Sequence, residues 1–141
     1  VQRSRKKTRR QTAVKLTPAK LRYLLTIAAL EKTGDGIRCI DIAVQLGVSR
    51  ASACRMLSAF AGEGILSQEP DRTVRLTETG RRMAQGYEDR FGQLYPFFHE
   101  TLELSPYDAR ECAMALCASL SQGSMTALCE SLAMKAGLPG C

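Results

Sequence analysis

Four polar residues and one alanine are spaced so that they could contact nucleic acid together. Ser49 follows a Gly-Val turn, and the segment after it has apolar residues at helical spacing. If Ser49 caps a helix there, Arg50, Ala51, Ser52 and Arg55 share its polar face. Guanidinium and hydroxyl groups near a helix N-terminus can donate hydrogen bonds to base edges and phosphates in a major groove. The segment is therefore predicted to be a DNA recognition helix; the alternative is an ordinary three-helix core with solvated arginines.

A second cationic segment lies at the start of the sequence. The net charge of the chain is +6, but residues 1–15 hold seven cations and no acid, whereas the rest of the chain holds 13 basic and 14 acidic residues. The segment has no apolar periodicity, which predicts a disordered arm. Such an arm is expected to contact the phosphates of double-stranded DNA, with a merely solubilising terminus as the alternative. Its candidate DNA contacts are Arg3, Arg5, Lys6, Lys7, Arg9 and Arg10.

The elements that must position the recognition helix have clear start and stop signals. A Thr-Pro pair begins a first helix, a glycine ends the second, and a Pro-Asp-Arg turn joins two extended segments into a two-stranded wing. Arg72 in that turn is a further candidate DNA contact. The expected elements are helices from Pro18 to Gly34, from 41 to 46 and from 50 to about 61, and strands 65–69 and 73–77.

The second half of the sequence predicts three more helices. Thr77 can cap a fourth helix, which should break or kink between Gly92 and Pro96 because proline lacks an amide N–H. Ser105 followed by proline begins a fifth helix. The last helix spans about 124–136, and both later helices carry apolar stripes that predict a dimer interface. The predicted organisation is an arm at 1–15, a winged helix-turn-helix domain at 16–80 and a helical dimerisation domain at 81–141.

Other function classes have little support in the sequence. A single histidine, His99, and the lack of a nucleophilic triad or a glycine-rich phosphate loop argue against an enzyme. His99 is expected to be solvated or hydrogen-bonded rather than a metal ligand. The six cysteines form no Cys-x-x-Cys pair, which favours reduced thiols. No apolar run is long enough to span a membrane and no signal-peptide core follows the basic arm, so a cytoplasmic protein with no membrane partner is expected.

With these elements placed, the sequence resembles the diphtheria-toxin-repressor family of iron- and manganese-dependent repressors. The most specific match is Leu-Thr-x-x-Gly-Arg directly after the predicted hairpin. The resemblance implies a mainly α fold with a winged helix-turn-helix and a helical dimerisation domain, and a homodimer that binds pseudo-palindromic operators. It also implies the short form of the family, without an added C-terminal barrel. The matching stretches are Tyr23-Leu24-Leu25-Thr26-Ile27, Asp41-Ile42-Ala43 with Leu46 and Ser49, and Leu76-Thr77-Glu78-Thr79-Gly80-Arg81.

The resemblance implies a divalent transition metal, but the ligand positions are degenerate. Family members take their ligands from the first, fourth and fifth helices. Iron(II) and manganese(II) prefer imidazole and carboxylate ligands, so the inherited site is predicted to be lost, with no cofactor expected. The residues that stand at the family's ligand positions are Arg22, Phe91, Tyr95, Arg110, Met114, Cys117 and Ala118.

Three hypotheses for the effector remain. A pocket between the two domains could sense a small molecule, although plain core packing would explain its aromatic residues equally. Thiol sensing or soft-metal binding by Cys112, Met114 and Cys117 is the second hypothesis, against buried structural thiols. Regulation by a partner protein or by protein concentration is the third. The runner-up to a DNA-binding repressor is a winged-helix protein-interaction module. The candidate effector pocket comprises Arg22, Phe91, Tyr95, Arg110, Met114 and Cys117.

Overall fold

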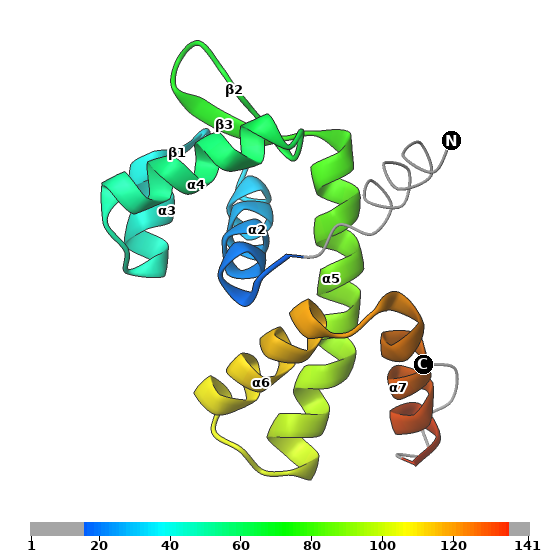
Figure 1. Cartoon of the computed structure of the whole chain (residues 1–141). Coiled ribbons are helices and arrows are strands. Elements are labelled where there is room, and N and C mark those ends of the chain that lie inside the picture. The colour runs from blue at the N-terminus through cyan, green and yellow to red at the C-terminus, as the bar shows by residue number, and fades with distance from the viewer. Residues whose placement is uncertain (1–15, 136–141) are drawn as a thin grey trace, which may run out of the picture.

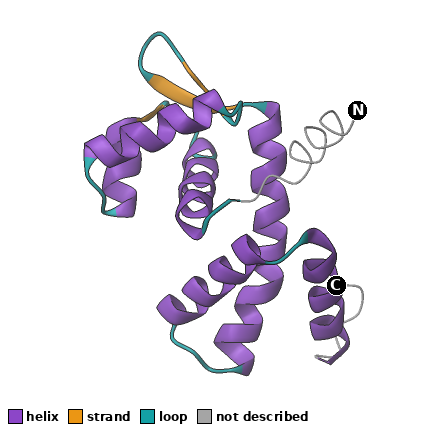
Figure 2. Ribbon diagram, in the orientation of Figure 1, coloured by secondary structure: helices purple, strands orange, loops and turns teal. Residues whose placement is uncertain are grey.

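The computed structural model describes residues 16–135, which fold as six helices and a small antiparallel sheet. Figure 1 shows α3, α4 and the sheet near one end of the long helix α5, and α6 and α7 near its other end. Helix α2 lies between the two groups. The distribution of helix and strand in Figure 2 confirms the predicted fold class, a mainly α chain with a winged helix-turn-helix. Within residues 16–135, no helix is both long and apolar enough to cross a membrane.

The first helix begins as the sequence predicts. α2 (Pro18–Glu31) is capped by Thr17, whose Oγ1 accepts a hydrogen bond from the amide of Lys20 at 3.2 Å. Its buried face packs into the core through Leu21, Leu24 and Ile27. That face contacts α3, α5 and α6, so α2 connects the helix-turn-helix to the helices that follow the wing.

The two helices of the helix-turn-helix begin and end at signals in the nearby sequence. α3 (Cys39–Leu46) begins two residues before its predicted start, because Asp41 accepts the amide of Arg38 at 2.8 Å from within the first turn. Gly47 ends it with a φ of +69°, a left-handed conformation that favours glycine. α4 (Arg50–Gly62) follows, and its buried face consists of Ala53, Leu57 and Phe60.

The wing contains one strand that the sequence analysis missed. β2 (Leu66–Gln68) and β3 (Thr73–Leu76) form the predicted hairpin, each slightly shorter than expected. β1 (Ile37–Arg38) pairs with the other side of β3, which places Arg38 opposite Thr73. A strand of two residues carries no detectable periodicity, and only its pairing with β3 defines it.

Helix α5 corrects a prediction. It runs without a break from Glu78 to Pro96, so the break expected between Gly92 and Pro96 is wrong. The departure from α geometry comes after the proline, in a π-helical segment, Phe97–Thr101, where the amide of Leu102 bonds the carbonyl of Phe97 at 3.0 Å. The wider turns that follow Pro96 let the chain stay helical beyond it.

The last two helices bury part of their apolar stripes within one chain. α6 (Pro106–Ser119) is capped by Ser105, as predicted, and packs on α2 and α5. α7 (Gln122–Lys135) contacts α5, and its own Met125 and Cys129 are buried. Leu116, Leu128 and Leu132 of the stripes are half-buried, so the dimer interface that the sequence analysis assigned to them stays a prediction. The predicted domain limit between residues 80 and 81 falls inside α5 and stays a prediction.

Candidate functional site

The exposed face of α4 carries the side chains predicted to read DNA. Ser49 is the N-cap, and its Oγ accepts the amide of Ser52 at 3.0 Å. Arg50, Ala51 and Arg55 are exposed, whereas Ser52 is half-buried and its Oγ lies 3.0 Å from that of Ser49 and 3.5 Å from Arg55 Nη2. The helix therefore presents two guanidinium groups beside a capped N-terminus, the end at which backbone amides favour anions.

The exposed arginines of the helix-turn-helix and wing form no ion pair among residues 16–135, although Arg38 attracts the carboxylate of Asp71. The ion pairs within residues 16–135 involve other basic residues, which are Lys20, Arg22, Lys32, Arg81 and Arg82. We call the helix-turn-helix and its wing (β1, α3, α4, β2 and β3) the reading end. Its exposed arginines without an ion pair are Arg38, Arg50, Arg55, Arg72 and Arg75. Sequence reasoning missed Arg38 and Arg75, because Arg38 belongs to the undetected strand and Arg75 was read only as a wing residue.

The tip of the wing holds Arg72 in an unusual conformation. Its φ is +70°, which is uncommon for a residue with a Cβ, and its amide bonds the carbonyl of Glu69 at 3.0 Å. The neighbouring Asp71 accepts the hydroxyl of Thr73 at 2.6 Å and the amide of Thr73 at 3.1 Å. These hydrogen bonds lower the pKa of the Asp71 carboxyl. Asp71 thus fixes the turn that projects Arg72. The six predicted contacts of the arm, Arg3, Arg5, Lys6, Lys7, Arg9 and Arg10, lie outside the described residues.

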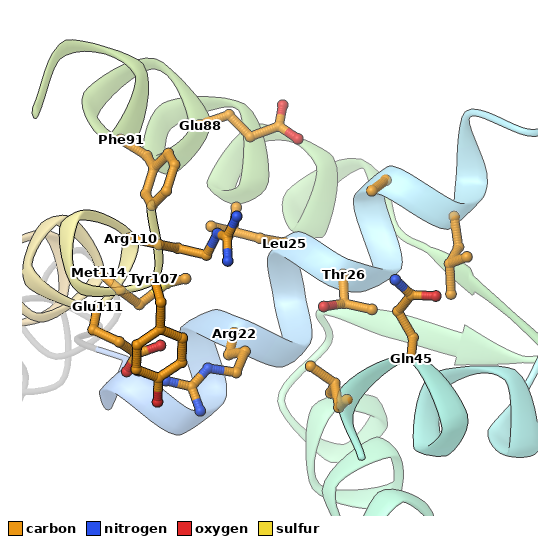
Figure 3. A pocket seen from close by; sticks show the side chains of 13 residues that line it. Arg22, Leu25, Thr26, Gln45, Glu88, Phe91, Tyr107, Arg110, Glu111 and Met114 are labelled. Carbon is orange, nitrogen blue, oxygen red and sulfur yellow. The ribbon is translucent and has the colours of Figure 1, made fainter. Parts of the chain in front are cut away.

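A cavity of about 810 Å³ opens between α2, α3, α5 and α6. Figure 3 shows Arg22, Leu25 and Thr26 reaching it from α2, Gln45 from α3, Glu88 and Phe91 from α5, and the remaining labelled side chains from α6. Its walls therefore come both from the helix-turn-helix side and from the helices after the wing. The residues that line it are Arg22, Leu25, Thr26, Ala29, Leu30, Gln45, Leu46, Glu88, Phe91, Tyr107, Arg110, Glu111 and Met114.

The charges in this cavity are unevenly matched. Arg22 Nη2 on α2 donates to Glu111 Oε1 on α6 at 2.8 Å, and Lys32 Nζ lies 3.4 Å from Glu88 Oε2. Arg110 has no carboxylate partner among residues 16–135. In Figure 3 its guanidinium extends from α6 toward the space between Phe91 and Leu25.

The structure brings together four of the six predicted pocket residues. Arg22, Phe91, Arg110 and Met114 line the cavity, whereas Tyr95 and Cys117 do not. Tyr95 instead stacks between Phe91 and His99, with ring centroids 5.8 and 5.4 Å away. His99 Nδ1 lies 3.0 Å from the carbonyl oxygen of Leu104, which confirms the predicted hydrogen-bonded role. Glu111 was missed because it stands at none of the family's ligand positions.

The donor set at the family's metal position does not fit iron(II) or manganese(II). Among the lining side chains the carboxylates are Glu88 and Glu111, and each is in an ion pair. Within the described chain, no three His, Cys, Asp or Glu side chains are grouped so that they could hold a metal ion. The lining also holds two guanidinium groups and one thioether, neither of which is a ligand that these hard cations prefer, and the side chains of Thr26, Gln45 and Tyr107.

The predicted thiol cluster on α6 is dispersed. Cys117 is buried, and burial raises the pKa of its thiol to about 11. Cys112 is half-buried, and five residues of α-helix separate the two by about 140° around the axis. Met114 faces the cavity instead. The sequence analysis missed a different thiol pair, Cys39 with Cys54 of α4. Burial, the larger cause, and a hydrogen bond with Cys54, the smaller one, raise the pKa of the Cys39 thiol to about 11.

Comparisons with known proteins agree with this geometry. Residues 22–70 match the IclR helix-turn-helix domain. The transcriptional regulator MntR of Escherichia coli O6:H1 is 31% identical over 105 residues, covering 74% of this chain and 67% of MntR. MntR of Salmonella typhimurium is 34% identical over 90 residues, covering 64% of this chain and 57% of the relative.

Solved structures show the same fold. The manganese regulator SloR matches with a TM-score of 0.73 at 22% identity, over 88% of this chain and 56% of SloR. IdeR of T. acidophilum matches with a TM-score of 0.68 at 17% identity, over 86% of this chain and 55% of IdeR. This chain thus spans little more than half of those two structures. On the strength of its likeness to MntR, the chain belongs to the diphtheria-toxin-repressor family, whose members are transcriptional regulators with a helix-turn-helix and not enzymes.

Proposed function

We propose that this protein is a cytoplasmic homodimeric repressor that binds a pseudo-palindromic operator without iron(II) or manganese(II). The observation that carries the proposal is the set of exposed arginines without ion pairs on α4, β1 and the wing. Residues 42–62 contain no acid at all, so the recognition helix and its turn are uniformly cationic or neutral. A polyanion supplies the countercharge that the chain itself does not.

Each arginine suits a particular part of a duplex. Arg50 and Arg55, on the exposed face of α4, would enter the major groove, where a guanidinium recognises guanine with two hydrogen bonds. Arg72 at the wing tip would reach the phosphates or minor groove beside it. Arg38 and Arg75 lie on neighbouring strands and would neutralise backbone phosphates. The basic arm would add nonspecific affinity in the same way.

The dimer would use the apolar side chains that one chain leaves accessible in its second half. The stripes of α6 and α7 are only partly buried within one chain, and Leu102, Tyr107 and Met134 are 49, 66 and 81% exposed. These apolar side chains belong to the half of the chain that follows the wing, away from α4. A two-fold interface through this half would leave two recognition helices free to enter half-sites about one DNA turn apart.

Metal independence follows from the chemistry of the cavity. At the position where family members hold a metal, Arg22 of α2 bonds Glu111 of α6 directly. A dication placed there would share the cavity with two guanidinium groups, Arg22 and Arg110, which would repel it. A direct ion pair between α2 and α6 thus replaces a bridge through metal, and DNA binding should need no loading step.

The decisive experiment is selection of bound duplexes from a random library, followed by affinity measurements on the selected operator. We expect a pseudo-palindromic site and an affinity that falls steeply with salt, by about 0.9 logarithmic units per phosphate neutralised for each tenfold rise in salt concentration. Exhaustive chelation, or addition of iron(II) or manganese(II), should leave the affinity unchanged. A clear gain with either ion would contradict metal independence, and shallow, sequence-independent binding would favour the protein-interaction module.

Copper(I) tests the alternative in which the protein senses a soft metal. The measurement would be repeated with copper(I) on the unmodified protein and on Cys112→Ser and Cys117→Ser. A gain with copper(I) that Cys117→Ser abolishes would support soft-metal sensing. We expect no gain, because Cys117 is buried and Cys112 lies about 140° away from it around the axis of α6.

A further inference from the structure

We propose that the cavity between α2, α3, α5 and α6 binds a small organic carboxylate with an apolar body, whose anionic group pairs with Arg110. The inference rests on the proposed function for its regulatory consequence, since such a ligand would act as the effector of a DNA-binding protein. Binding itself requires neither DNA nor metal. The size of the cavity, about 810 Å³, lies within the range of sites for small molecules.

The charge of the ligand follows from the pairing inside the cavity. Glu111 is engaged by Arg22, and Glu88 is engaged by Lys32. Arg110 alone among the lining charges has no ionic partner in the described chain. The cavity therefore presents one uncompensated positive charge, in the planar form that binds a carboxylate through two parallel hydrogen bonds.

The body of the ligand follows from the walls. Leu25, Phe91 and Met114 flank the space into which Arg110 extends, and they would contact hydrocarbon or an aromatic ring (Figure 3). Apolar side chains flank one guanidinium, the arrangement of sites that bury a ligand's body and orient it by a few polar contacts. Inorganic phosphate would satisfy the charge but leave these apolar walls in contact with water.

Other lining side chains offer hydrogen bonds that the protein does not use. The side chains of Thr26, Gln45 and Tyr107 line the cavity and make no hydrogen bond within residues 16–135. They can donate to, or accept from, a hydroxyl or carbonyl on the ligand. One bound molecule could thus contact the three helices that carry them, α2, α3 and α6.

That connection predicts a regulatory effect. Thr26 and Gln45 belong to α2 and α3, on the helix-turn-helix side, whereas Phe91 and Arg110 belong to α5 and α6. A ligand that contacts both sides fixes their relative position and so changes operator affinity. By linkage, operator DNA must change the affinity for the ligand by the same factor.

The test is isothermal titration of the full chain, without DNA, with benzoate and phenylacetate, and with benzamide and inorganic phosphate as matched probes. We expect a dissociation constant for a carboxylate on the order of 1 mM, typical of ligands this small. Arg110→Gln should weaken binding about tenfold or more, through loss of a charge-assisted pair. Arg82→Gln, which removes an exposed arginine paired with Glu78 away from the cavity, should leave binding unchanged.

The outcomes separate this inference from the proposed function. Failure of both carboxylates to bind, or equal binding to the wild type and Arg110→Gln, overturns the inference. Binding of phosphate or benzamide as tight as that of the carboxylates also overturns it. Protein that binds the selected operator yet no carboxylate refutes this inference alone, whereas protein that binds a carboxylate but no DNA refutes the proposed function alone. Circular dichroism confirms that each variant is folded.

Discussion

The helix-turn-helix with its wing and the helices that follow it differ in how they treat charge. At the reading end, five exposed arginines have no ion pair among the described residues, and residues 42–62 hold no acid. Around the cavity, Arg22, Lys32, Glu88 and Glu111 are matched in pairs, and Arg110 is the exception. The difference indicates two kinds of surface. In our proposal the first receives its countercharge from a polyanion, whereas the charges that line the cavity are matched within the chain except at Arg110.

Gly80 lies where α5 packs against the wing, and substituting it should have the largest effect on stability. A Cβ on Gly80, in the first turn of α5, would collide with the carbonyl oxygen of Ile65. That carbonyl is held by the amide and the hydroxyl of Thr77, both at 3.0 Å, so it has little freedom to move. Gly80→Ala should therefore lower the free energy of unfolding by about 2–4 kcal/mol, measured by urea denaturation.

Gly92→Ala is the matched control in the same helix. Nothing lies within 4 Å of the Cβ position at Gly92, which is exposed in the interior of α5. The substitution should stabilise the protein by about 0.5–1 kcal/mol, because alanine loses less backbone entropy than glycine in a helix. Equal effects of the two substitutions would show that close packing of α5 on Ile65 is not what requires Gly80.

The second prediction concerns the unpaired arginines themselves. Arg55→Ala should weaken binding to the selected operator by about 1–3 kcal/mol, if its guanidinium contacts a guanine. Lys32→Ala removes an exposed cation that pairs with Glu88, and it should leave operator affinity unchanged. Electrophoretic mobility shifts on specific and random duplexes measure both. If Lys32→Ala weakened operator binding as much as Arg55→Ala, the loss would reflect the net charge of the protein and not a specific contact of Arg55.

Sequence alone defined the reading end well, because its signals are local. Caps at Thr17 and Ser49 each form the predicted hydrogen bond, since a cap needs only residues three positions away. Gly47 likewise ends α3 as expected. The strand β1 was missed because two residues show no periodicity and depend on β3, far along the chain.

The region around the cavity depends on distant contacts, and there the sequence was less informative. Pro96 predicted a break or kink before it, but α5 runs to Pro96 and the chain continues as the π-helical segment Phe97–Thr101. The apolar stripes of α6 and α7 were assigned to a dimer interface, and part of each packs within the chain, because periodicity shows which face is buried and not which element covers it. Glu111 became visible only when α6 was placed against α2.

The ion pair between Arg22 and Glu111 should show the smallest effect, and it tests the internally balanced region. Its atoms are 2.8 Å apart, but the two side chains are 42 and 37% exposed, so water screens the attraction. A double-mutant cycle of Arg22→Gln and Glu111→Gln should give a coupling energy of about 0.2–1 kcal/mol in unfolding experiments. The same cycle in operator affinity should give a coupling of the same sign if the pair holds α2 against α6 in the DNA-binding form.

The matched control within the helix-turn-helix is the ion pair of Lys20 on α2 with Glu63, the residue after α4, whose charged atoms are 3.1 Å apart. Coupling in stability without coupling in operator affinity would mean that Arg22 and Glu111 stabilise the fold alone and do not replace a metal bridge.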